Sequence, residues 1–303
     1  MELFSRKKHY LCIIIDMENV EREHSVNIRG RLIELKRPIV MGILNVTPDS
    51  FYAASRKQTE QEIAERAREI VRDGGSIIDI GACSTRPGAG AVSQNEEAER
   101  LRVALAVIRQ VLPDAMISVD TFRPEVARRC IEEWGADIIN DVGSLPSVTT
   151  AEERHELMNA EMSRRDEMFH LVAEQQVPYI LMSSQPDAES MLMEWAEQLS
   201  RLRAWGAKDI ILDPGFGFGK TTEQNHQLLR DLRKLTVAGC PLLVGVSRKS
   251  MIWKRLGITP EQSLNGTTIL HTLAVERGAS ILRVHDVREA VEVVKLVEEE
   301  FKK

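Results

Sequence analysis

The sequence predicts a single (β/α)8 (TIM) barrel with a short N-terminal hairpin extension, and three observations support this fold class. Eight short aliphatic runs alternate with amphipathic stretches between residues 39 and 301. The runs are predominantly apolar on both faces, which is typical of buried parallel strands. Eight strand-helix units in a chain of 303 residues match the size of a closed barrel. A doubly wound open sheet is the alternative that this pattern leaves open.

The segment before the barrel is predicted to end in a hairpin. Residues 1–26 are basic and then mixed and show no clear period, so we treat them as an extension of unknown role. Residues 27–35 place Arg29 and Gly30 between short β-friendly pieces, which is typical of a hairpin that plugs or leads into the next element. The barrel domain is therefore expected to span residues 27–303.

The strands and helices of the barrel are expected to follow in regular alternation. The predicted strands are residues 39–44, 76–80, 116–119, 137–139, 179–182, 209–212, 242–246 and 280–284. The predicted helices are residues 60–72, 95–111, 124–134, 166–175, 190–204, 223–235, 262–277 and 287–301. Two helix starts carry local signals: Thr59 with Glu62 fits a capping box, and Pro124 fits a first helical turn.

Composition and charge disfavour several classes of function. The net charge of -6 and the pI near 5.8 give no basic surface for nucleic acid. The apolar run at residues 11–15 is far shorter than the roughly 20 residues that a membrane span requires. The four cysteines are scattered without a C-x-x-C pair, which disfavours zinc clusters and disulfide frameworks. We expect a soluble, cytoplasmic protein that binds neither nucleic acid nor membrane.

Polar residues stand at the carboxyl ends of the predicted strands, where barrel enzymes carry their chemistry. They are Asn45, Ser84, Thr85, Arg86, Asp120, Asn140, Asp141, Ser183, Asp213, Ser247, Arg248, Lys249, Arg283, His285 and Asp286. Because a closed barrel gathers these ends into one annulus, we predict a ligand site there. Arg283 and His285 lie two residues apart and project from the same side of the last strand, beside Asn45 on the first.

The segment at residues 210–220, IILDPGFGFGK, is the strongest single site signal. An aliphatic strand delivers Asp213 to its end and is followed by Pro214 and three alternating glycines, which allow the backbone to approach another group closely. A P-loop requires glycine at the position of Pro214. A dinucleotide-binding fingerprint requires glycine at the position of Lys220. Neither phosphate motif is therefore present.

Taken together, seven motifs resemble dihydropteroate synthase, and the resemblance runs from about residue 39 to the C-terminus. The motifs are MGILNVTPDSF at 41–51, STRPG at 84–88, SVDT at 118–121, INDV at 139–142, DPGFGFG at 213–219, SRKS at 247–250 and RVHD at 283–286. Related pterin-binding methyltransferase domains share the barrel, but the STRPG and SRKS segments are not expected in them.

The resemblance implies condensation of 6-hydroxymethyl-7,8-dihydropterin pyrophosphate with p-aminobenzoate, by a dissociative displacement that releases pyrophosphate. The residues implied for pterin binding are Asp120, Asn140, Met182, Asp213 and Lys249. Those implied for pyrophosphate binding are Asn45, Arg86, Arg283 and His285. Those implied for p-aminobenzoate binding are Thr85, Pro87, Phe218, Ser247 and Ser250. Catalysis would fall to Asn45, Arg86, Lys249, Arg283 and His285, with Asn45 also binding Mg²⁺. The family expectation is a homodimer packed through the late helices.

Three segments depart from the family pattern. Phe51 is followed by Tyr52-Ala53-Ala54 in place of Ser-Asp-Gly-Gly, and Ala82-Cys83 replaces the usual Gly-Glu. The fifth strand ends in Met182-Ser183-Ser184, where the family has Met-His-Met. These departures surround the expected site, so a catalytically weak pterin-binding paralogue and a methyltransferase-type module are the alternatives to an active synthase.

Overall fold

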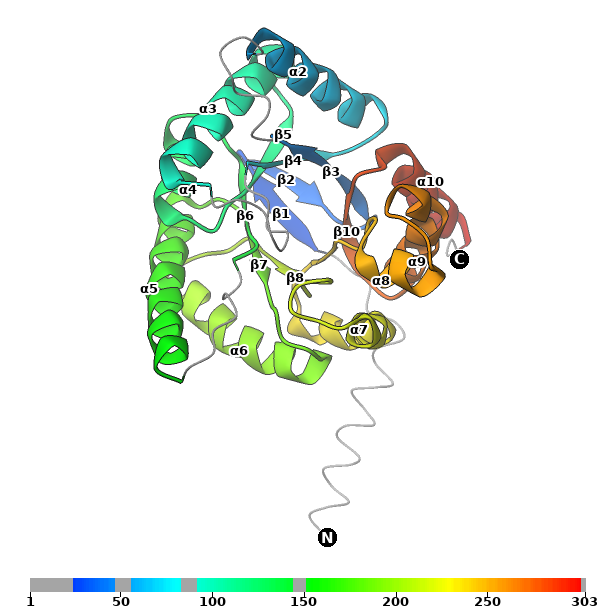
Figure 1. Ribbon diagram of the computed structural model, residues 1–303. Coiled ribbons are helices and arrows are strands. Elements are labelled where there is room, and N and C mark those ends of the chain that lie inside the picture. Colours follow the sequence, from blue (N-terminus) through cyan, green and yellow to red (C-terminus); the bar gives the residue numbers. More distant parts are fainter. Residues whose placement is uncertain (1–23, 47–55, 83–91, 144–150, 301–303) are drawn as a thin grey trace.

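The centre of the molecule is a closed barrel of eight parallel strands (Figure 1). The computed structural model describes residues 24–46, 56–82, 92–143 and 151–300. The strands are β3 (Ile39–Asn45), β4 (Ile77–Gly81), β5 (Met116–Asp120), β6 (Ile138–Asp141), β7 (Tyr179–Met182), β8 (Ile210–Asp213), β9 (Leu242–Val244) and β10 (Ala279–Val284). β10 pairs in parallel with both β9 and β3, which closes the ring. The predicted barrel is confirmed, and the open-sheet alternative is wrong.

Helices surround the barrel, most of them close to the predicted positions (Figure 1). They are α2 (Arg56–Arg72), α3 (Gln94–Val111), α4 (Pro124–Glu132), α5 (Ala151–Gln175), α6 (Ala188–Ala204), α7 (Thr222–Leu235), α8 (Ser250–Leu256), α9 (Leu264–Glu276) and α10 (Val287–Glu300). No helix in the described ranges is long and apolar enough to cross a membrane.

Helix starts show where the local signals were sufficient and where they were not. Pro124 occupies the first turn of α4, as predicted. Thr59 lies inside α2, which begins at Arg56, so the predicted capping box is wrong. α5 begins at Ala151, well before the predicted start at residue 166. The early turns were not predicted because the charged N-terminal half of the helix shows little helical periodicity. Sequence reasoning missed α8, which is too short to establish a period.

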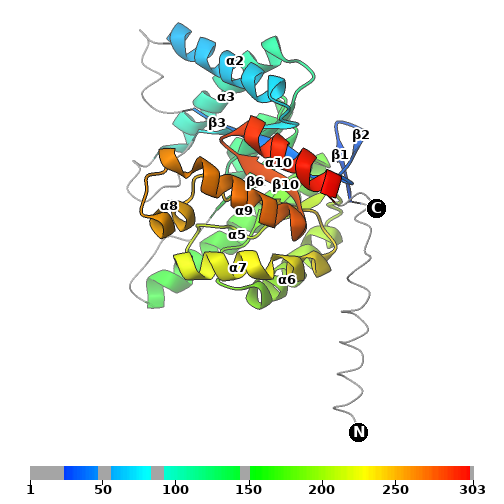
Figure 2. The same ribbon diagram turned by 90° about the vertical axis from the view of Figure 1, so that its right-hand side faces the viewer.

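A two-stranded antiparallel hairpin, β1 (Ser25–Ile28) and β2 (Arg31–Glu34), plugs the amino-terminal end of the barrel. Val26, Ile28 and Leu35 pack against an interior layer of apolar side chains. The buried members of that layer are Met41, Ile77, Ile138, Ile180, Ile211, Leu243 and Ile281. The backbone N of Asn27 donates to Asp209 Oδ1 at 2.8 Å, which fixes the hairpin to the barrel. Figure 2 shows the hairpin and α8 at opposite ends of the molecule.

The interior of the barrel changes from apolar to polar along each of several strands. Side chains two residues apart face the same side of a strand, so a residue two positions after the apolar layer also points inward. At that position four strands change to a polar residue: Ile77 is followed by Asp79, Ile138 by Asn140, Ile211 by Asp213 and Ile281 by Arg283. The alternation therefore builds a polar floor directly on the apolar layer.

Candidate active site

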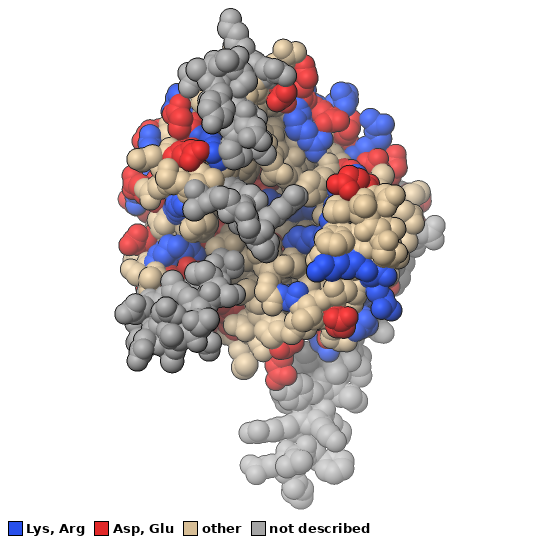
Figure 3. All heavy atoms as spheres, in the orientation of Figure 1, with Lys and Arg blue, Asp and Glu red and all other residues tan. Residues whose placement is uncertain are grey.

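The carboxyl ends of the strands surround a mouth with basic groups at its centre. Figure 1 views the barrel from this end, since α8 follows β9 and lies in front while the hairpin lies behind. Figure 3, in the same orientation, shows Lys and Arg atoms near the middle of the face within a rim of both charges. The mouth can therefore attract an anion although the chain as a whole is acidic.

Arg283 joins two acidic side chains at the floor of the mouth. Its Nε donates to Asp79 Oδ2 at 2.7 Å, and its Nη2 donates to Asp120 Oδ2 at 2.8 Å. Burial lowers the pKa of Arg283, but Asp79 and Asp120 outweigh that effect and raise it above its usual value. The guanidinium has five N–H donors, so donors remain for a further anion. Sequence reasoning missed Asp79, whose signal is a lone carboxylate within the otherwise aliphatic strand β4.

Asn140 offers a buried acceptor inside the barrel. Its Nδ2 donates toward the carboxylate of Asp79, 3.2 Å from Oδ2 and 3.4 Å from Oδ1. Its Oδ1 is buried and has no hydrogen-bond partner among the described residues, and the same holds for Ser118 Oγ on β5. A buried polar atom without a partner costs about 1–3 kcal/mol. A ligand that donates a hydrogen bond to Asn140 Oδ1 would remove that cost.

The carboxylate of Asp120 has a pKa close to neutral pH. Burial raises this pKa most strongly, the Arg283 guanidinium lowers it, and the neighbouring carboxylate of Asp79 raises it again. The result is a pKa of about 7 for Asp120. The side chain therefore changes from hydrogen-bond donor and acceptor to pure acceptor within the physiological pH range.

Asp213 ends β8 and is held by the glycine loop that follows it. The backbone N of Gly215 donates to Asp213 Oδ1 at 2.8 Å. Burial raises the pKa of Asp213, while the nearby ammonium group of Lys249 opposes that shift. The predicted turn after the strand is confirmed, since Gly215 and Gly217 adopt φ values of 61° and 82°, which favour glycine.

Lys249 projects into the mouth against the same loop. Its Nζ donates to the carbonyl oxygen of Phe216 and lies 4.8 Å from the centroid of the Phe218 ring. Gly217 has a φ of 82°, and a Cβ there would lie only 3.1 Å from Lys249 Cδ, so glycine suits this close contact. Burial lowers the pKa of Lys249 to about 8, although Asp213 opposes the shift. The structure thus brings Asp213, Lys249 and Phe218 together, as predicted.

His285 and Asn45 lie on either side of the seam between β10 and β3. Ser247 Oγ is 3.2 Å from both the backbone N and Nδ1 of His285, so this hydroxyl contacts His285. Arg66 of α2 donates to the carbonyl oxygens of His285 at 2.6 Å and Ile43 at 3.4 Å. α2 therefore holds both strands of the seam from outside. Asn45 is exposed at the end of β3.

Arg248 and Asp286, two further polar residues of the predicted annulus, pair with each other. The guanidinium contacts the carboxylate through two hydrogen bonds of 2.8 Å, from Nε and from Nη2. Nη1 donates to the carbonyl oxygens of Pro260 at 3.1 Å and Glu261 at 2.8 Å. Arg248 has a φ of 53°, which is rare for a residue with a side chain. This backbone turn separates the anchored Arg248 from Lys249, which enters the mouth.

The neighbouring ends of β6 and β7 are held by structural contacts. Asp141 Oδ2 accepts from Arg164 Nη1 at 2.9 Å and from the Tyr179 hydroxyl at 2.7 Å, so this carboxylate is already satisfied. Ser183, which replaces the usual histidine, donates to Glu194 Oε2 at 2.5 Å. Met182 is buried beside the loop after β8, and its contact with the pterin stays a prediction.

Several predicted residues fall outside the described part of the chain. Thr85, Arg86 and Pro87 lie in residues 83–91, and Ala53 lies in residues 47–55. Their predicted contributions to the phosphate and p-aminobenzoate pockets remain predictions. Ser250 begins α8 directly after Lys249 and is half-buried beside the mouth.

Asn45 presents a side-chain oxygen of the kind that a hard cation binds. A Cβ at Gly81 would lie 3.4 Å from Asn45 Oδ1 and 3.8 Å from Asp120 Oδ2, so both oxygens face the backbone of Gly81. No group of three or more His, Cys, Asp and Glu side chains arranged for a metal occurs in the described ranges. Mg²⁺ commonly takes one or two protein oxygens and completes its shell with phosphate and water. The donor set present here fits that pattern.

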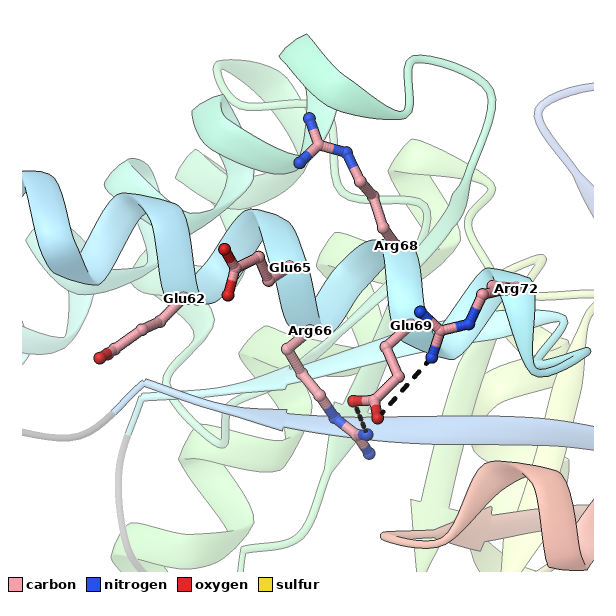
Figure 4. A pocket seen from close by; sticks show the side chains of 6 residues that line it. All are labelled: Glu62, Glu65, Arg66, Arg68, Glu69 and Arg72. Atoms are coloured by element: carbon pink, nitrogen blue, oxygen red, sulfur yellow. Dashed lines mark hydrogen bonds and ion pairs between the residues drawn. The ribbon is translucent and has the colours of Figure 1, made fainter.

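A separate depression runs along the outside of α2. It has a volume of about 580 Å³ and charged side chains line it (Figure 4). They are Glu62, Glu65, Arg66, Arg68, Glu69 and Arg72. Among them, Glu69 forms ion pairs with Arg66 and Arg72. Since one solvated helix face provides the lining, we assign no ligand to it.

Comparison with known proteins places this site in a family. The family profile described as pterin binding enzyme matches residues 41–285. The dihydropteroate synthase of Escherichia coli (strain K12) is 38% identical over 276 residues, which cover 89% of this chain and 94% of that protein.

Solved structures agree. The Xanthomonas albilineans dihydropteroate synthase with 4-aminobenzoic acid has a TM-score of 0.75 and 35% identity, and the match covers 91% of this chain and 97% of that one. The Yersinia pestis enzyme with a pterine-sulfa conjugate has a TM-score of 0.74 and 34% identity, covering 91% and 99%. The chain belongs to the pterin-binding enzyme family and, within it, to the dihydropteroate synthases.

Proposed function

We propose that this chain, as a dihydropteroate synthase, uses the mouth of its barrel to join 6-hydroxymethyl-7,8-dihydropterin pyrophosphate to p-aminobenzoate. The observation that carries the proposal is the buried Oδ1 of Asn140, which has no partner among the described residues and lies beside Asp120 on the neighbouring strand. These acceptors, with Asp213, complement the N–H groups along one edge of a pterin. A purely apolar ring would leave them without partners.

The two cations of the mouth divide between the ring and its leaving group. Lys249 lies between Asp213 and Phe218, where its ammonium can donate to the pterin carbonyl. Arg283 is fixed by Asp79 and Asp120 through Nε and Nη2, and its remaining donors can bind the pyrophosphate. His285, supported by Ser247, and Asn45 lie on the adjoining seam and can complete the anion pocket.

This arrangement supports a dissociative displacement. The pterin ring can stabilise positive charge on the methylene carbon, so the bond to the pyrophosphate oxygen can break ahead of attack by the arylamine. Fixed donors around the departing pyrophosphate stabilise the developing negative charge, and fixed acceptors around the ring hold its orientation. The arylamine nitrogen then forms the new C–N bond and loses a proton, and no protein nucleophile is required.

Mg²⁺ is part of the proposal as an ion that binds together with the substrate. Asn45 would hold it through its side-chain oxygen. The ion would supply positive charge to the pyrophosphate oxygens. Pterin binding without phosphate should then be independent of Mg²⁺.

The second substrate is assigned from the relatives. The Xanthomonas albilineans enzyme carries 4-aminobenzoic acid, and the Yersinia pestis enzyme carries a pterine-sulfa conjugate. In this chain the aromatic ring of Phe218 stands next to Lys249 and can form one wall of an arylamine pocket beside the pterin. Thr85 and Pro87 would contribute to the same pocket, whereas Arg86 would bind the pyrophosphate.

A pyrophosphate-release assay tests the reaction. We expect release only when the pterin pyrophosphate, p-aminobenzoate and Mg²⁺ are all present. A weak paralogue would bind pterin without release, and a methyltransferase-type module would show no response to p-aminobenzoate. Turnover that is the same with and without p-aminobenzoate would contradict the proposal.

The assembly is expected to be a homodimer through the late helices. Ile269 on α9 and Leu296 on α10 are 52% and 70% exposed, which fits a surface that another copy could cover. Light scattering on the purified chain should give twice the monomer mass. A monomeric mass across the accessible concentration range would contradict this expectation.

A further inference from the structure

Lys220, at the end of the glycine loop, directs its side chain back into the protein. Its Nζ donates to three carbonyl oxygens, those of Gly215 at 3.0 Å, Phe218 at 3.2 Å and Ser183 at 3.4 Å. It forms no ion pair with any described carboxylate. Ser183 follows β7, whereas Gly215 and Phe218 belong to the loop after β8. One ammonium group therefore ties the loop to the neighbouring strand.

The loop lies directly on the strand end that Lys220 grips. A Cβ at Gly215 would stand 2.3 Å from the carbonyl oxygen of Ser183, so only glycine permits this approach. The backbone N of Phe218 donates to the carbonyl oxygen of Gly215 at 3.1 Å, which closes a tight turn. That carbonyl is also one of the three that Lys220 binds. We call these three hydrogen bonds of Lys220 the clamp, so the turn and the clamp share one acceptor.

Asn225 of α7 holds the loop from its other side. Its Oδ1 accepts from the backbone N of Gly217 at 2.7 Å, and its Nδ2 donates to the carbonyl oxygens of Lys220 at 3.2 Å and Thr221 at 2.7 Å. Asn225 is almost completely buried, with 1% of its surface exposed. Asn225 therefore fixes the loop near Phe216, while Lys220 fixes it at Phe218.

We propose that Lys220 is a positioning residue for the arylamine half of the site: its ammonium holds Phe218 in place without touching a substrate. This rests on the proposed function, in which Phe218 lines the p-aminobenzoate pocket. The clamp uses the backbone carbonyl of Ser183, so it is retained although this chain lacks the usual histidine side chain there. Phe216, which supplies the carbonyl partner of Lys249, stays fixed through Asn225. Lys220 also acts on the charge of Asp213, but less than Lys249 and Arg283 do, so pterin binding should depend less on Lys220 than p-aminobenzoate binding does.

The test is Lys220→Met, which keeps an unbranched apolar stem and removes the donors. We expect the KM for p-aminobenzoate to rise about tenfold or more, the scale of one hydrogen bond to a charged group. The Kd for the pterin, measured by calorimetry without the second substrate, should change less than about threefold, as expected for a group that does not contact that ligand. Lys220→Arg keeps the charge and should restore part of the loss. Lys234→Met on the exposed face of α7 is the matched control and should change neither value.

A second variant shows whether Lys220 acts through Phe218. In a Phe218→Ala background, Lys220→Met should raise the KM for p-aminobenzoate no further, because the ring that it positions is absent. An additional full-size rise would overturn the proposal. Equal losses of pterin and p-aminobenzoate affinity in Lys220→Met alone would also overturn it, since that result indicates general distortion of the mouth.

Hydrogen exchange separates this inference from the proposed reaction. The Phe218 amide, bonded to Gly215, should exchange at least about tenfold faster in Lys220→Met, while amides of the barrel strands keep their rates. This measurement requires no turnover. An unchanged Phe218 exchange rate would overturn the clamp even in an active enzyme, whereas a faster rate in an inactive one would overturn only the proposed reaction.

Discussion

The two ends of the barrel are built from the same strands but have opposite chemistry. At the amino-terminal end, an aliphatic layer is closed by the apolar side of the hairpin. Two residues further along the strands, roughly 7 Å away, Asp79, Asn140 and Arg283 form a polar floor. The first end resembles an ordinary core, whereas the second keeps charges and an unpartnered acceptor in a protein interior.

The apolar layer of the barrel contributes mainly to stability, whereas the polar floor contributes to ligand binding. Apolar burial at the hairpin end lowers the free energy of the folded state without needing any ligand. The charge of Arg283 is tolerated in the interior because it is paired with Asp79 and Asp120. Changes at the hairpin end should therefore affect unfolding alone, and changes at the floor of the mouth should affect unfolding and binding together.

Asp79→Ala is expected to have the largest effect, because it acts on both properties. It removes one partner of a buried ion pair and the acceptor for Asn140 Nδ2, which should cost about 3–5 kcal/mol of unfolding free energy. Pterin affinity should fall at least about tenfold, because Asn140 and Arg283 lose their orientation. Urea unfolding and calorimetry measure the two effects. Asp73→Ala, which removes ion pairs with the exposed side chains of Arg72 and Arg288, is the control and should change both by little.

Ile28→Ala at the hairpin end should separate the two properties. Ile28 is 3% exposed, and truncating a buried isoleucine costs about 2–5 kcal/mol. The pterin Kd should stay unchanged, because the aliphatic layer lies between the hairpin and the mouth. Leu32→Ala in the same hairpin, at a site that is 65% exposed, is the control for unfolding. A large change in pterin affinity for Ile28→Ala would remove the distinction between the two ends.

At the charged end of the barrel, the sequence predicted the fold better than it predicted the contacts between side chains. Aliphatic runs and strand-end polar residues were sufficient to predict the barrel and to place Asp213 and Lys249 at one end of it, whereas the family resemblance placed Phe218 beside them. The partners of Arg283 could not be read, because Asp79 is distant in sequence and inside an aliphatic strand. The predicted annulus also did not distinguish Arg248 and Asp286, which neutralise each other, from Lys249. The spacing of residues along a strand predicts which face of the strand a side chain lies on. It does not predict which charged group of another strand that side chain contacts.

The pH dependence of pterin binding sharpens the comparison at the charged end. Asp120, with a pKa of about 7, accepts hydrogen bonds best as a carboxylate, so affinity should fall as the pH drops below 7. Lys249, with a pKa of about 8, loses its charge as the pH rises, so affinity should also fall above 8. We expect a bell-shaped profile with about a tenfold loss per pH unit on each limb at its limit.

Two variants check the assignment of that profile. Asp120→Asn should weaken binding and remove the acidic limb, because the amide does not titrate. Ile28→Ala should leave both limbs in place, since its side chain lies in the apolar end. A profile that keeps its acidic limb in Asp120→Asn would assign that limb to another group.

Ser183→Ala is expected to have the smallest effect and tests whether the departure at β7 belongs to the mouth or to the supporting structure. Ser183 is fully buried, and its hydroxyl donates to Glu194 on α6. Loss of this hydrogen bond should cost about 1–2 kcal/mol of unfolding free energy. Turnover and both substrate affinities should stay within about twofold, because Lys220 uses the backbone carbonyl, which the substitution retains. Urea unfolding and steady-state kinetics measure these values, and the exposed neighbour Ser184→Ala provides the control. A selective rise in the KM for p-aminobenzoate would show instead that the serine side chain has taken over a role at the mouth.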